Sequence, residues 1–399
     1  MSSKRDRMSG NEAVALAIKQ VNPDVMPAFP ITPSTELPQI VSTYISNGDI
    51  DTEFIPVESE HSSMSAAIGA EAAGARTMTA TSSCGLAFMW EVLYVAASNR
   101  LPLAMAVVNR ALSGPININA EHSDSMGARD SGWLQIYAET NQEAYDNWIQ
   151  AYRISEHKDV LLPIMICQDG FITSHAVQNI ELIEDEKVKA FVGEYKPEHY
   201  LLNTNETMAI GPYANGPYCM EAKRAQAQGM INAKQVILDV AAEFAAISGR
   251  KYGLFEEYFL EDADYALVAI GSACGNIKDA VDELRAKGIK AGLLKVRVFR
   301  PFPGEEMAEA LRHCKVVAIM DRAESYSSQG GPLGAELMAA MYRAGVTSKA
   351  INVIYGLNGR DMTVSMVEDI YAHLAEIDKR GLRSEDHYNY IGLRDKEVR

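Results

Sequence analysis

Continuous apolar runs alternate along this chain with segments of helical periodicity. The most apolar runs lie at residues 101–109, 160–168, 265–270 and 316–320. Strands that are apolar without alternation are typical of parallel sheets buried on both faces. Amphipathic segments separate the runs, among them residues 10–21, with Asn11 as a possible cap, and a segment opened by Ser34. The pattern therefore predicts an α/β fold of parallel sheets covered by helices.

Three segments interrupt this alternation. Residues 113–139 are polar and irregular, and long connections of this kind are usually functional or disordered. Residues 189–218 are rich in turn formers, and a long polar helix over about 221–250 is expected to connect to a second α/β unit. The segment 351–363 is expected to close the second sheet, and the charged tail after Lys379 to be peripheral.

The stretch from Ile55 to Ser83 combines carboxylates with a helix of small residues. Glu58 and Glu60 come just before a segment made almost wholly of Ala, Gly, Ser and Met. Small side chains let a helix approach other backbones closely, as beneath an active site or at a subunit interface. A carboxylate at a helix N-terminus is favoured by the helix dipole but is costly if buried without a partner. Either glutamate could therefore cap the helix or bind a ligand.

Composition and charge exclude several classes of function. The net charge of −16 disfavours nucleic acid and anionic membranes as partners, because their phosphates would be repelled. The five cysteines are scattered without a CxxC pair, so we expect no iron–sulfur cluster held by this chain alone. No secretory segment is expected at the N-terminus, and no apolar run approaches the roughly 20 residues that span a bilayer. We therefore expect a soluble cytoplasmic protein.

Two glycine-containing turns resemble nucleotide-binding motifs without completing them. GSACGNIKDAV, residues 271–281, follows a strand and opens a helix, but it lacks the third glycine of G-x-G-x-x-G. DGF, residues 169–171, lacks the G-D-G and following Asn that hold Mg²⁺ and a diphosphate in thiamine enzymes. Both are predicted to be plain turns at the ends of strands.

Two polar residues follow predicted strands at positions suited to substrate binding. Arg110 ends a buried strand, where open α/β sheets bind ligands, and its guanidinium could grip a carboxylate with two hydrogen bonds. An ion pair with Asp124, Asp130 or Glu60 is the alternative. Thr32 lies in FPITP, a loop stiffened by two prolines, which suits substrate positioning but is also common where a strand simply ends.

Several motifs in order resemble one enzyme family. They are AFPITPSTE, PVESEHSSMSAAIGAEAAGARTMTATSS, VNRALSGPIN, ARDSGWLQIYAE, LLPIMICQDGF, KVRVFRPFP and GLNGRD. Together they resemble the alpha subunit of the pyruvate:ferredoxin (2-oxoacid:acceptor) oxidoreductases, over roughly residues 9–375. These enzymes use thiamine diphosphate to decarboxylate a 2-oxoacid, pass two electrons through iron–sulfur clusters and conserve the acyl group as acyl-CoA.

The resemblance implies a fold and a division of labour between subunits. Residues 1–255 would form a thiamine-diphosphate pyrimidine-binding region, and residues 256–399 a transketolase C-terminal-like region. The diphosphate and Mg²⁺ would be held by a beta subunit. The [4Fe-4S] clusters would lie in further subunits, gamma and delta or fused equivalents. The missing G-D-G and the scattered cysteines agree with this division.

The resemblance also implies roles for individual residues. Glu60 matches the glutamate that hydrogen-bonds N1′ of the aminopyrimidine ring and promotes loss of the thiazolium C2 proton. Arg110 matches the arginine that binds the substrate carboxylate. Pro30 and Thr32 match the loop beside cofactor and substrate, and Ser83 is expected among the cofactor-binding residues.

The chain also departs from the family pattern in ways that leave the substrate open. Cys84 stands where Gln or Gly is expected, and the segments 117–130 and 321–332 also differ. Pyruvate is the first expectation; phenylglyoxylate, a branched-chain 2-oxoacid and oxalate are alternatives. A non-catalytic scaffold subunit is the alternative from another class, and an NAD-linked dehydrogenase is disfavoured by the incomplete glycine loop.

Overall fold

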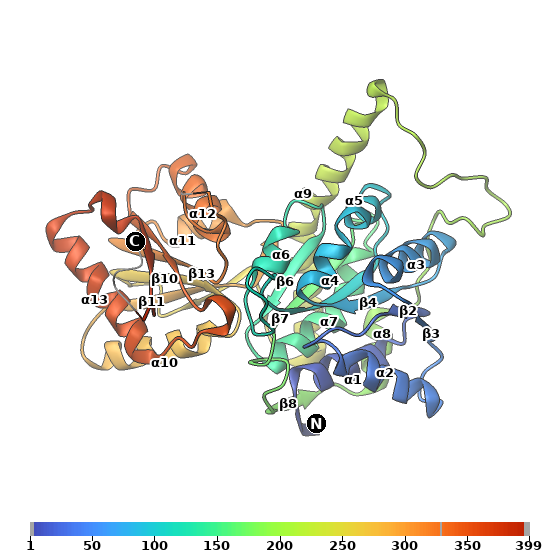
Figure 1. Ribbon diagram of the computed structural model, residues 1–399, viewed down its shortest axis with the longest axis horizontal. Coiled ribbons are helices and arrows are strands. Elements are labelled where there is room, and N and C mark those ends of the chain that lie inside the picture. The colour runs from blue at the N-terminus through green and yellow to red at the C-terminus, as the bar shows by residue number, and fades with distance from the viewer. Residues whose placement is uncertain (1–3, 328, 395–399) are drawn as a thin grey trace.

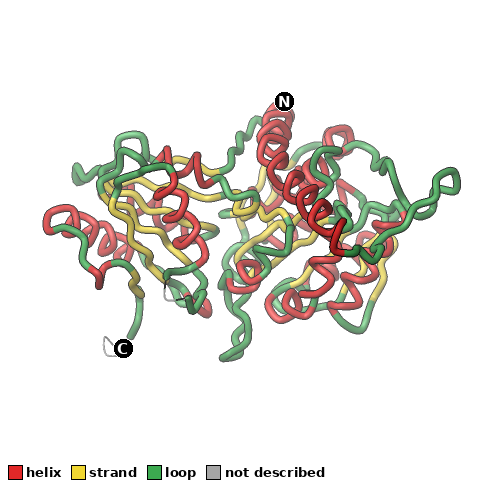
Figure 2. The backbone as a smooth tube through the Cα atoms, turned by 90° about the horizontal axis from the view of Figure 1, so that it is seen from above, coloured by secondary structure: helices red, strands yellow, loops and turns green. Residues whose placement is uncertain are grey.

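A computed structural model describes residues 4–327 and 329–394, which form two α/β units side by side (Figures 1 and 2). The predicted fold class is confirmed. The strands of the first half are β1 (Lys4–Met8), β2 (Val25–Ala28), β3 (Glu53–Pro56), β4 (Met78–Thr81), β5 (Ala104–Asn109), β6 (Leu134–Ala138), β7 (Ile164–Asp169) and β8 (Gln178–Leu182). Its helices are α1 (Gly10–Val21), α2 (Glu36–Ser46), α3 (Glu60–Ala73), α4 (Ser83–Phe88), α5 (Trp90–Ser98), α6 (Ser123–Gly127), α7 (Asn141–Ser155), α8 (Asp185–Val192) and α9 (Gly216–Ser248).

The first sheet has the strand order β12-β6-β7-β5-β4. Strands β4 to β7 are parallel, and β12 (Val298–Arg300) pairs antiparallel with β6 at the edge. The parallel pair β2–β3 extends the layer through a bridge between Val25 and Thr77. Every residue of β5 and β7 is buried, as their continuous apolar runs predict.

Helices cover both faces of this first sheet. Helices α1, α2, α7, α8 and α9 contribute to a core on one face, which includes the fully buried Trp148 and Tyr145. Helices α3, α4 and α5 contribute to a second core on the other face, around Trp133. The N-terminal part of α9 and the segment before it project from the body of the molecule (Figure 1).

The second sheet has the strand order β15-β14-β13-β10-β11-β9. Its strands are β9 (Phe255–Tyr258), β10 (Tyr265–Ile270), β11 (Ala291–Val296), β13 (Val316–Asp321), β14 (Lys349–Ile354) and β15 (Tyr388–Tyr390). All are parallel except β9, which runs antiparallel to β11. The accompanying helices are α10 (Ala273–Ala286), α11 (Gly304–Ala310), α12 (Pro332–Arg343) and α13 (Val364–Arg380), with short 3₁₀ helices at Leu357–Gly359 and Ser384–Asp386.

The two units share one continuous apolar core. The core around Trp133 includes Met64 of α3 as well as Val268 of β10 and Leu337 of α12. Strand β12 belongs to the first sheet although it follows β11 of the second sheet in the sequence. The proposed division after residue 255 stays a prediction.

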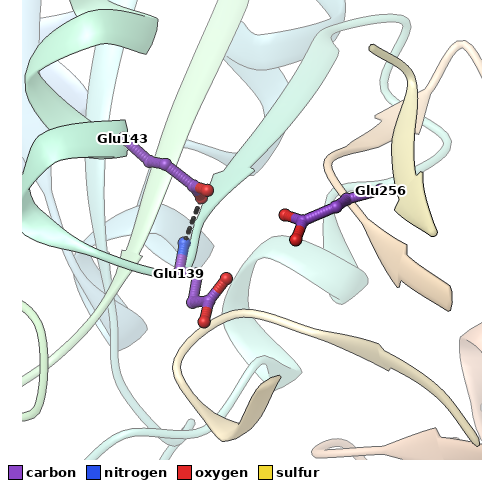
Figure 3. A group of neighbouring side chains, drawn as sticks. All are labelled: Glu139, Glu143 and Glu256. Carbon is purple, nitrogen blue, oxygen red and sulfur yellow. Dashed lines mark hydrogen bonds between the residues drawn. The ribbon is translucent and has the colours of Figure 1, made fainter. Parts of the chain in front are cut away.

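A charged network also joins the units. The Lys295 ammonium lies 2.8 Å from Glu139 Oε2 and 2.5 Å from oxygens of Glu143 and Glu256. Lys278 bonds Glu139 and Glu256 at 2.8 and 2.9 Å. Figure 3 shows the three carboxylates pointing toward one another from the first and second halves of the chain. Because Lys295 already supplies a cation to all three, we interpret the group as an ion-pair network rather than a metal site.

Several predicted details were wrong. Helix α1 is capped by Ser9 in a capping box with Glu12, while Asn11 lies inside the helix and donates to the Pro33 carbonyl. Helix α2 begins at Glu36, and the Ser34 hydroxyl bonds the Ile31 carbonyl instead.

One strand in each sheet also differs from the prediction. The irregular segment 113–139 contains β6, whose Gln135 side chain is buried and bonds the Ser125 carbonyl, so polarity concealed a strand. The tail after Lys379 adds β15 to the edge of the second sheet, outside β14.

Candidate functional site

Helix α3 is made of small residues because it lies close against neighbouring strands. The Ser63 hydroxyl donates to the Pro27 carbonyl at 2.8 Å and lies 2.8 Å from Thr79 Oγ1. A larger side chain at position 63 would separate the helix from β2 and β4. This close packing fixes where the first turn of α3, and therefore Glu60, lies.

The two glutamates that precede the small residues have different environments. Ser59, and neither glutamate, is the N-cap: its hydroxyl accepts from the Ser62 N–H at 3.2 Å. Glu58 is exposed and accepts from the Ser62 hydroxyl, which holds the pKa of Glu58 below its usual value. Glu60 is 7% exposed, and no hydrogen bond reaches its carboxylate from the residues that the structure describes. The capping alternative is therefore wrong for Glu60.

Glu60 points at a glycine that leaves room beside it. A Cβ at Gly85 would lie 2.7 Å from Glu60 Oε1 and 2.5 Å from Thr81 Oγ1, so only glycine fits there. The hydroxyls of Thr81 and Ser82 are buried without a hydrogen-bond partner among the described residues. Buried polar groups are normally hydrogen-bonded, so three such groups close together in the fold indicate a ligand that bears hydrogen-bonding atoms.

Asp124 connects the ends of two neighbouring strands. Its Oδ2 accepts the backbone N–H groups of Ser83 and Arg110, each at 2.9 Å. Its Oδ1 accepts from the Asn109 amide at 2.9 Å and the Ser125 N–H at 2.7 Å. Burial raises the pKa of Asp124, and these hydrogen bonds oppose the rise. Asp124 therefore holds the segment after β4 in register with the segment after β5.

Ser83 lies between these elements with its side chain already bonded. Its φ of 49° is in the left-handed region, and its hydroxyl donates to the Ala111 carbonyl. The hydroxyl therefore ties the two loops together, and its predicted contribution to a cofactor site stays a prediction.

Arg110 is buried and bound to backbone rather than to a carboxylate. Its Nε donates to the Asn117 carbonyl at 2.8 Å and its Nη1 to the Thr32 carbonyl at 2.9 Å. Within residues 4–327 and 329–394 no carboxylate oxygen lies within 4 Å of its guanidinium nitrogens, so the predicted alternative of an ion pair is wrong. The guanidinium keeps donors for a further acceptor.

The predicted site residues converge at one edge of the first layer. Pro30 and Thr32 follow β2 and are exposed, Glu60 follows β3, Ser83 follows β4 and Arg110 follows β5. These four strands run parallel, so their carboxyl ends meet at the same edge, where open α/β sheets bind ligands.

Cys84 also lies at this edge. Its Sγ is 3.0 Å from Ser113 Oγ. Burial alone would raise the pKa of the Cys84 thiol, but hydrogen bonds with Ser113 and Ser83 and the charge of Arg110 lower it. The residue that departs from the family pattern is thus a neighbour of the arginine expected to bind substrate.

Sequence reasoning missed a second polar group, which lies between the two units. Asp169 accepts from the Ser272 N–H at 2.9 Å and the Arg322 guanidinium at 3.2 Å, and its Oδ1 is 2.6 Å from His122 Nε2. Burial would raise the pKa of Asp169, but His122, Arg322 and Ser272 hold it well below its usual range. The motifs predicted to be plain turns, at residues 169–171 and 271–281, therefore join the units through this carboxylate.

Comparisons with known proteins agree with this arrangement. Residues 16–242 match the family model described as pyruvate flavodoxin/ferredoxin oxidoreductase, thiamine diphosphate-binding, and residues 263–367 match pyruvate:ferredoxin oxidoreductase core domain II. The chain is 48% identical to pyruvate synthase subunit PorA of Thermotoga maritima, over 98% of this chain and 99% of that one. It is 41% identical to ketoisovalerate oxidoreductase subunit VorA of Pyrococcus abyssi, over 94% of each chain.

Solved structures share the fold at low sequence identity. The 2-oxoglutarate:ferredoxin oxidoreductase from Magnetococcus marinus superposes with a TM-score of 0.73 at 20% identity. The comparison covers 93% of this chain, which spans 65% of the length of that one. A split-gene transketolase superposes with a TM-score of 0.52 at 12% identity, over 93% of this chain and 96% of that one. Among the described residues, no helix is long and apolar enough to cross a membrane.

Proposed function

Because this chain belongs to the pyruvate flavodoxin/ferredoxin oxidoreductase family, we propose that it is the alpha subunit of a 2-oxoacid oxidoreductase. The enzyme would oxidatively decarboxylate a 2-oxoacid, pyruvate first, to CO₂ and acyl-CoA, and pass the electrons to ferredoxin or another acceptor. The observation that supports pyruvate as the substrate is the 48% identity to a pyruvate synthase subunit over almost the whole of both chains. The scaffold alternative is disfavoured, because a scaffold does not require an unpartnered buried carboxylate at Glu60.

The Glu60 region fits the aminopyrimidine part of thiamine diphosphate. Thiamine diphosphate, when bound, supplies the nucleophilic carbon and the electron-accepting ring for decarboxylation. Glu60 would accept a hydrogen bond from a ring N–H, and the Thr81 and Ser82 hydroxyls are free to bond other polar atoms. Gly85 keeps this space open, since any side chain there would meet Glu60 and Thr81. In this role Glu60 exchanges a proton with the ring and acts as a general acid–base group.

Arg110 would bind the carboxylate of the 2-oxoacid. Its guanidinium is oriented by the Thr32 and Asn117 carbonyls, which leaves the remaining N–H groups for two parallel bonds to a carboxylate. Thr32, with Pro30 before it, would line the same space from the loop after β2. Asp124 holds the backbone of Arg110 and Ser83 together, so it would keep substrate and cofactor in mutual register.

Partner subunits would complete the site. A beta subunit would hold the diphosphate and Mg²⁺, and cluster-bearing gamma and delta or fused subunits would carry the [4Fe-4S] centres. In support, large apolar side chains lie exposed near the site, including Phe88 at 57%, Trp90 at 45% and Ile116 at 80%. Exposed apolar residues in such numbers are typical of surfaces that bind another protein. Residues 1–255 would form the pyrimidine-binding region and residues 256–399 the transketolase C-terminal-like region.

A branched-chain 2-oxoacid is the second candidate substrate. The 41% identity to a ketoisovalerate oxidoreductase subunit favours it over phenylglyoxylate and oxalate. The test is a panel of 2-oxoacids assayed with the co-purified complex, CoA and a viologen dye. We expect pyruvate to give the highest kcat/KM. A higher kcat/KM for ketoisovalerate would mean that ketoisovalerate, and not pyruvate, is the substrate. If none of the acids reduced the dye, the enzymatic proposal would be overturned.

A further inference from the structure

A cavity of about 520 Å³ lies beside the C-terminal end of helix α3, whereas Glu60 lies at the N-terminal end. It is bounded by the C-terminal part of α3, the segment 99–102, the end of α7 and the segment 194–210. Glu71, the α3 residue that lines this cavity, is eleven positions after Glu60, which is about 16 Å along a helix. The cavity is therefore distinct from the proposed catalytic site and has a volume typical of small-molecule sites.

Glu71 lines this cavity, and one of its carboxylate oxygens has no hydrogen-bond partner among the described residues. The side chain is buried, with 3% of the residue exposed. Its Oε2 accepts from the Thr77 N–H at 3.0 Å and the Thr77 hydroxyl at 2.6 Å, whereas Oε1 has no hydrogen-bond partner among the described residues. The Tyr195 hydroxyl lies near enough to lower the pKa of Glu71, but it forms no hydrogen bond with Oε1.

The basic groups of the cavity are already engaged or point to solvent. Arg100 gives its guanidinium hydrogens to the carbonyls of Val160, Leu161 and Ala225. The Arg76 guanidinium, beside the cavity, forms two bonds with Glu156 at 2.6 and 2.8 Å.

The remaining charged groups lie at the rim. Lys158, Lys196, Glu194 and Glu198 are largely exposed, and His199 pairs with Glu206 at 3.1 Å. Among the main causes of the raised Glu71 pKa, the only charged group is Glu156, whose like charge raises the pKa further. Apolar side chains complete the walls: Leu101, Pro102, Leu161, Met208 and Ile210.

We propose that this cavity binds a small organic cation, an ammonium or amidinium group on an apolar body, which donates a hydrogen bond to Glu71 Oε1. The apolar walls take the body of the ligand, and the free carboxylate oxygen takes its charged end. A cation suits the site better than a neutral donor, because it also offsets the repulsion between Glu71 and Glu156.

The proposal is tested with benzamidine and benzylamine as cationic probes, and with benzyl alcohol as a neutral probe of similar size. Binding to the co-purified complex is followed by calorimetry and by ligand-observed NMR. We expect the cations to bind saturably with a Kd of about 1 mM or tighter, and benzyl alcohol at least about tenfold more weakly. Affinity should rise between pH 6 and 8, because burial places the pKa of Glu71 at about 7 and only the ionised form attracts a cation.

Two variants locate the site. Glu71→Gln keeps the shape of the side chain and its Thr77 contacts, and it should weaken binding of the cationic probes at least about tenfold. Glu198→Gln at the exposed rim is the matched control and should change their affinity less than about twofold. Ala209→Phe fills the cavity from the covering segment and should block binding without altering Glu71.

Three outcomes would overturn the proposal. They are no saturable binding of either cation, equal binding of benzyl alcohol, and cation binding unchanged in both Glu71→Gln and Ala209→Phe. Because none of these measurements uses turnover, the proposal stands or fails independently of the proposed catalytic function.

Discussion

Glu71 should make the stability of this protein depend on pH in a way that one substitution can isolate. Burial raises the pKa of Glu71 from 4.5 to about 7, and the hydrogen bonds from Thr77 and the nearby Tyr195 hydroxyl only partly oppose the rise. The folded protein therefore binds the Glu71 proton more tightly than the unfolded chain does. This contribution to stability is complete below pH 4.5 and is lost as the pH rises through 7.

The size of the effect follows from the difference between the two pKa values. A difference of about 2.5 pK units corresponds to about 3.4 kcal/mol, since one unit is 1.36 kcal/mol. Asp321 titrates in an overlapping range, because burial raises its pKa from 3.8 to about 6, so the wild-type profile alone would combine the two groups. The difference between Glu71→Gln and wild type cancels the Asp321 contribution.

The assay is denaturant unfolding of wild type and Glu71→Gln at a series of pH values from 5 to 8. Glutamine cannot ionise, so the variant should gain stability relative to wild type as the pH rises, by about 2.5 kcal/mol between pH 5 and pH 8. A difference that stays constant within about 1 kcal/mol would show that Glu71 is not a buried titrating group, and the reasoning would be refuted.

Four further predictions concern single side chains. Glu60→Gln should lower turnover at least about 10²-fold and slow C2-proton exchange of bound thiamine diphosphate, measured by NMR; wild-type rates of both would contradict an acid–base role. Arg110→Lys should lower kcat/KM by about 10- to 100-fold, and by similar factors for a small and a bulky 2-oxoacid, because lysine keeps the charge but loses the planar fork. Factors that differ more than about tenfold would mean that Arg110 contacts the acyl group. Asp124→Asn should destabilise the protein by about 3–6 kcal/mol in denaturant unfolding, because an amide can replace only two of the four hydrogen bonds to a carboxylate; unchanged stability would remove Asp124 from its connecting role. Lys295→Met should cost about 3 kcal/mol, the lower end for a broken buried pair, because it removes the buried cation that Glu139, Glu143 and Glu256 share while Lys278 still pairs with Glu139 and Glu256. Lys287→Met at an exposed pair should leave stability nearly unchanged.

The sequence predicted those features that depend on local pattern. The continuous apolar runs identified β5 and β7, because strands buried on both faces need no polar alternation. The small residues after Glu60 indicated a closely packed helix, which α3 is, and the family motifs placed the site residues at strand ends.

Features that depend on distant partners were not predictable in this way. Strand β6 was missed because its buried Gln135 finds a partner in the Ser125 carbonyl, which a pattern of polarity cannot reveal. Asp169 was predicted to be a turn residue because its partners His122, Ser272 and Arg322 come from three other parts of the chain and leave no local pattern. Asp124 was considered only as an ion-pair partner of Arg110, whereas it binds the backbone N–H of that residue.

Strand β12 has a consequence for the order in which the protein can be assembled on the ribosome. The first sheet ends at β6 until Val298–Arg300 pairs with it, and by then β10 and β11 of the second sheet have already been synthesised. The nascent first half therefore carries an open strand edge, which is a template for unwanted pairing with other chains. Synthesis of the first half alone does not complete its sheet, so a fragment cut before residue 298 should be prone to aggregate, and the two units should mature together rather than one after the other.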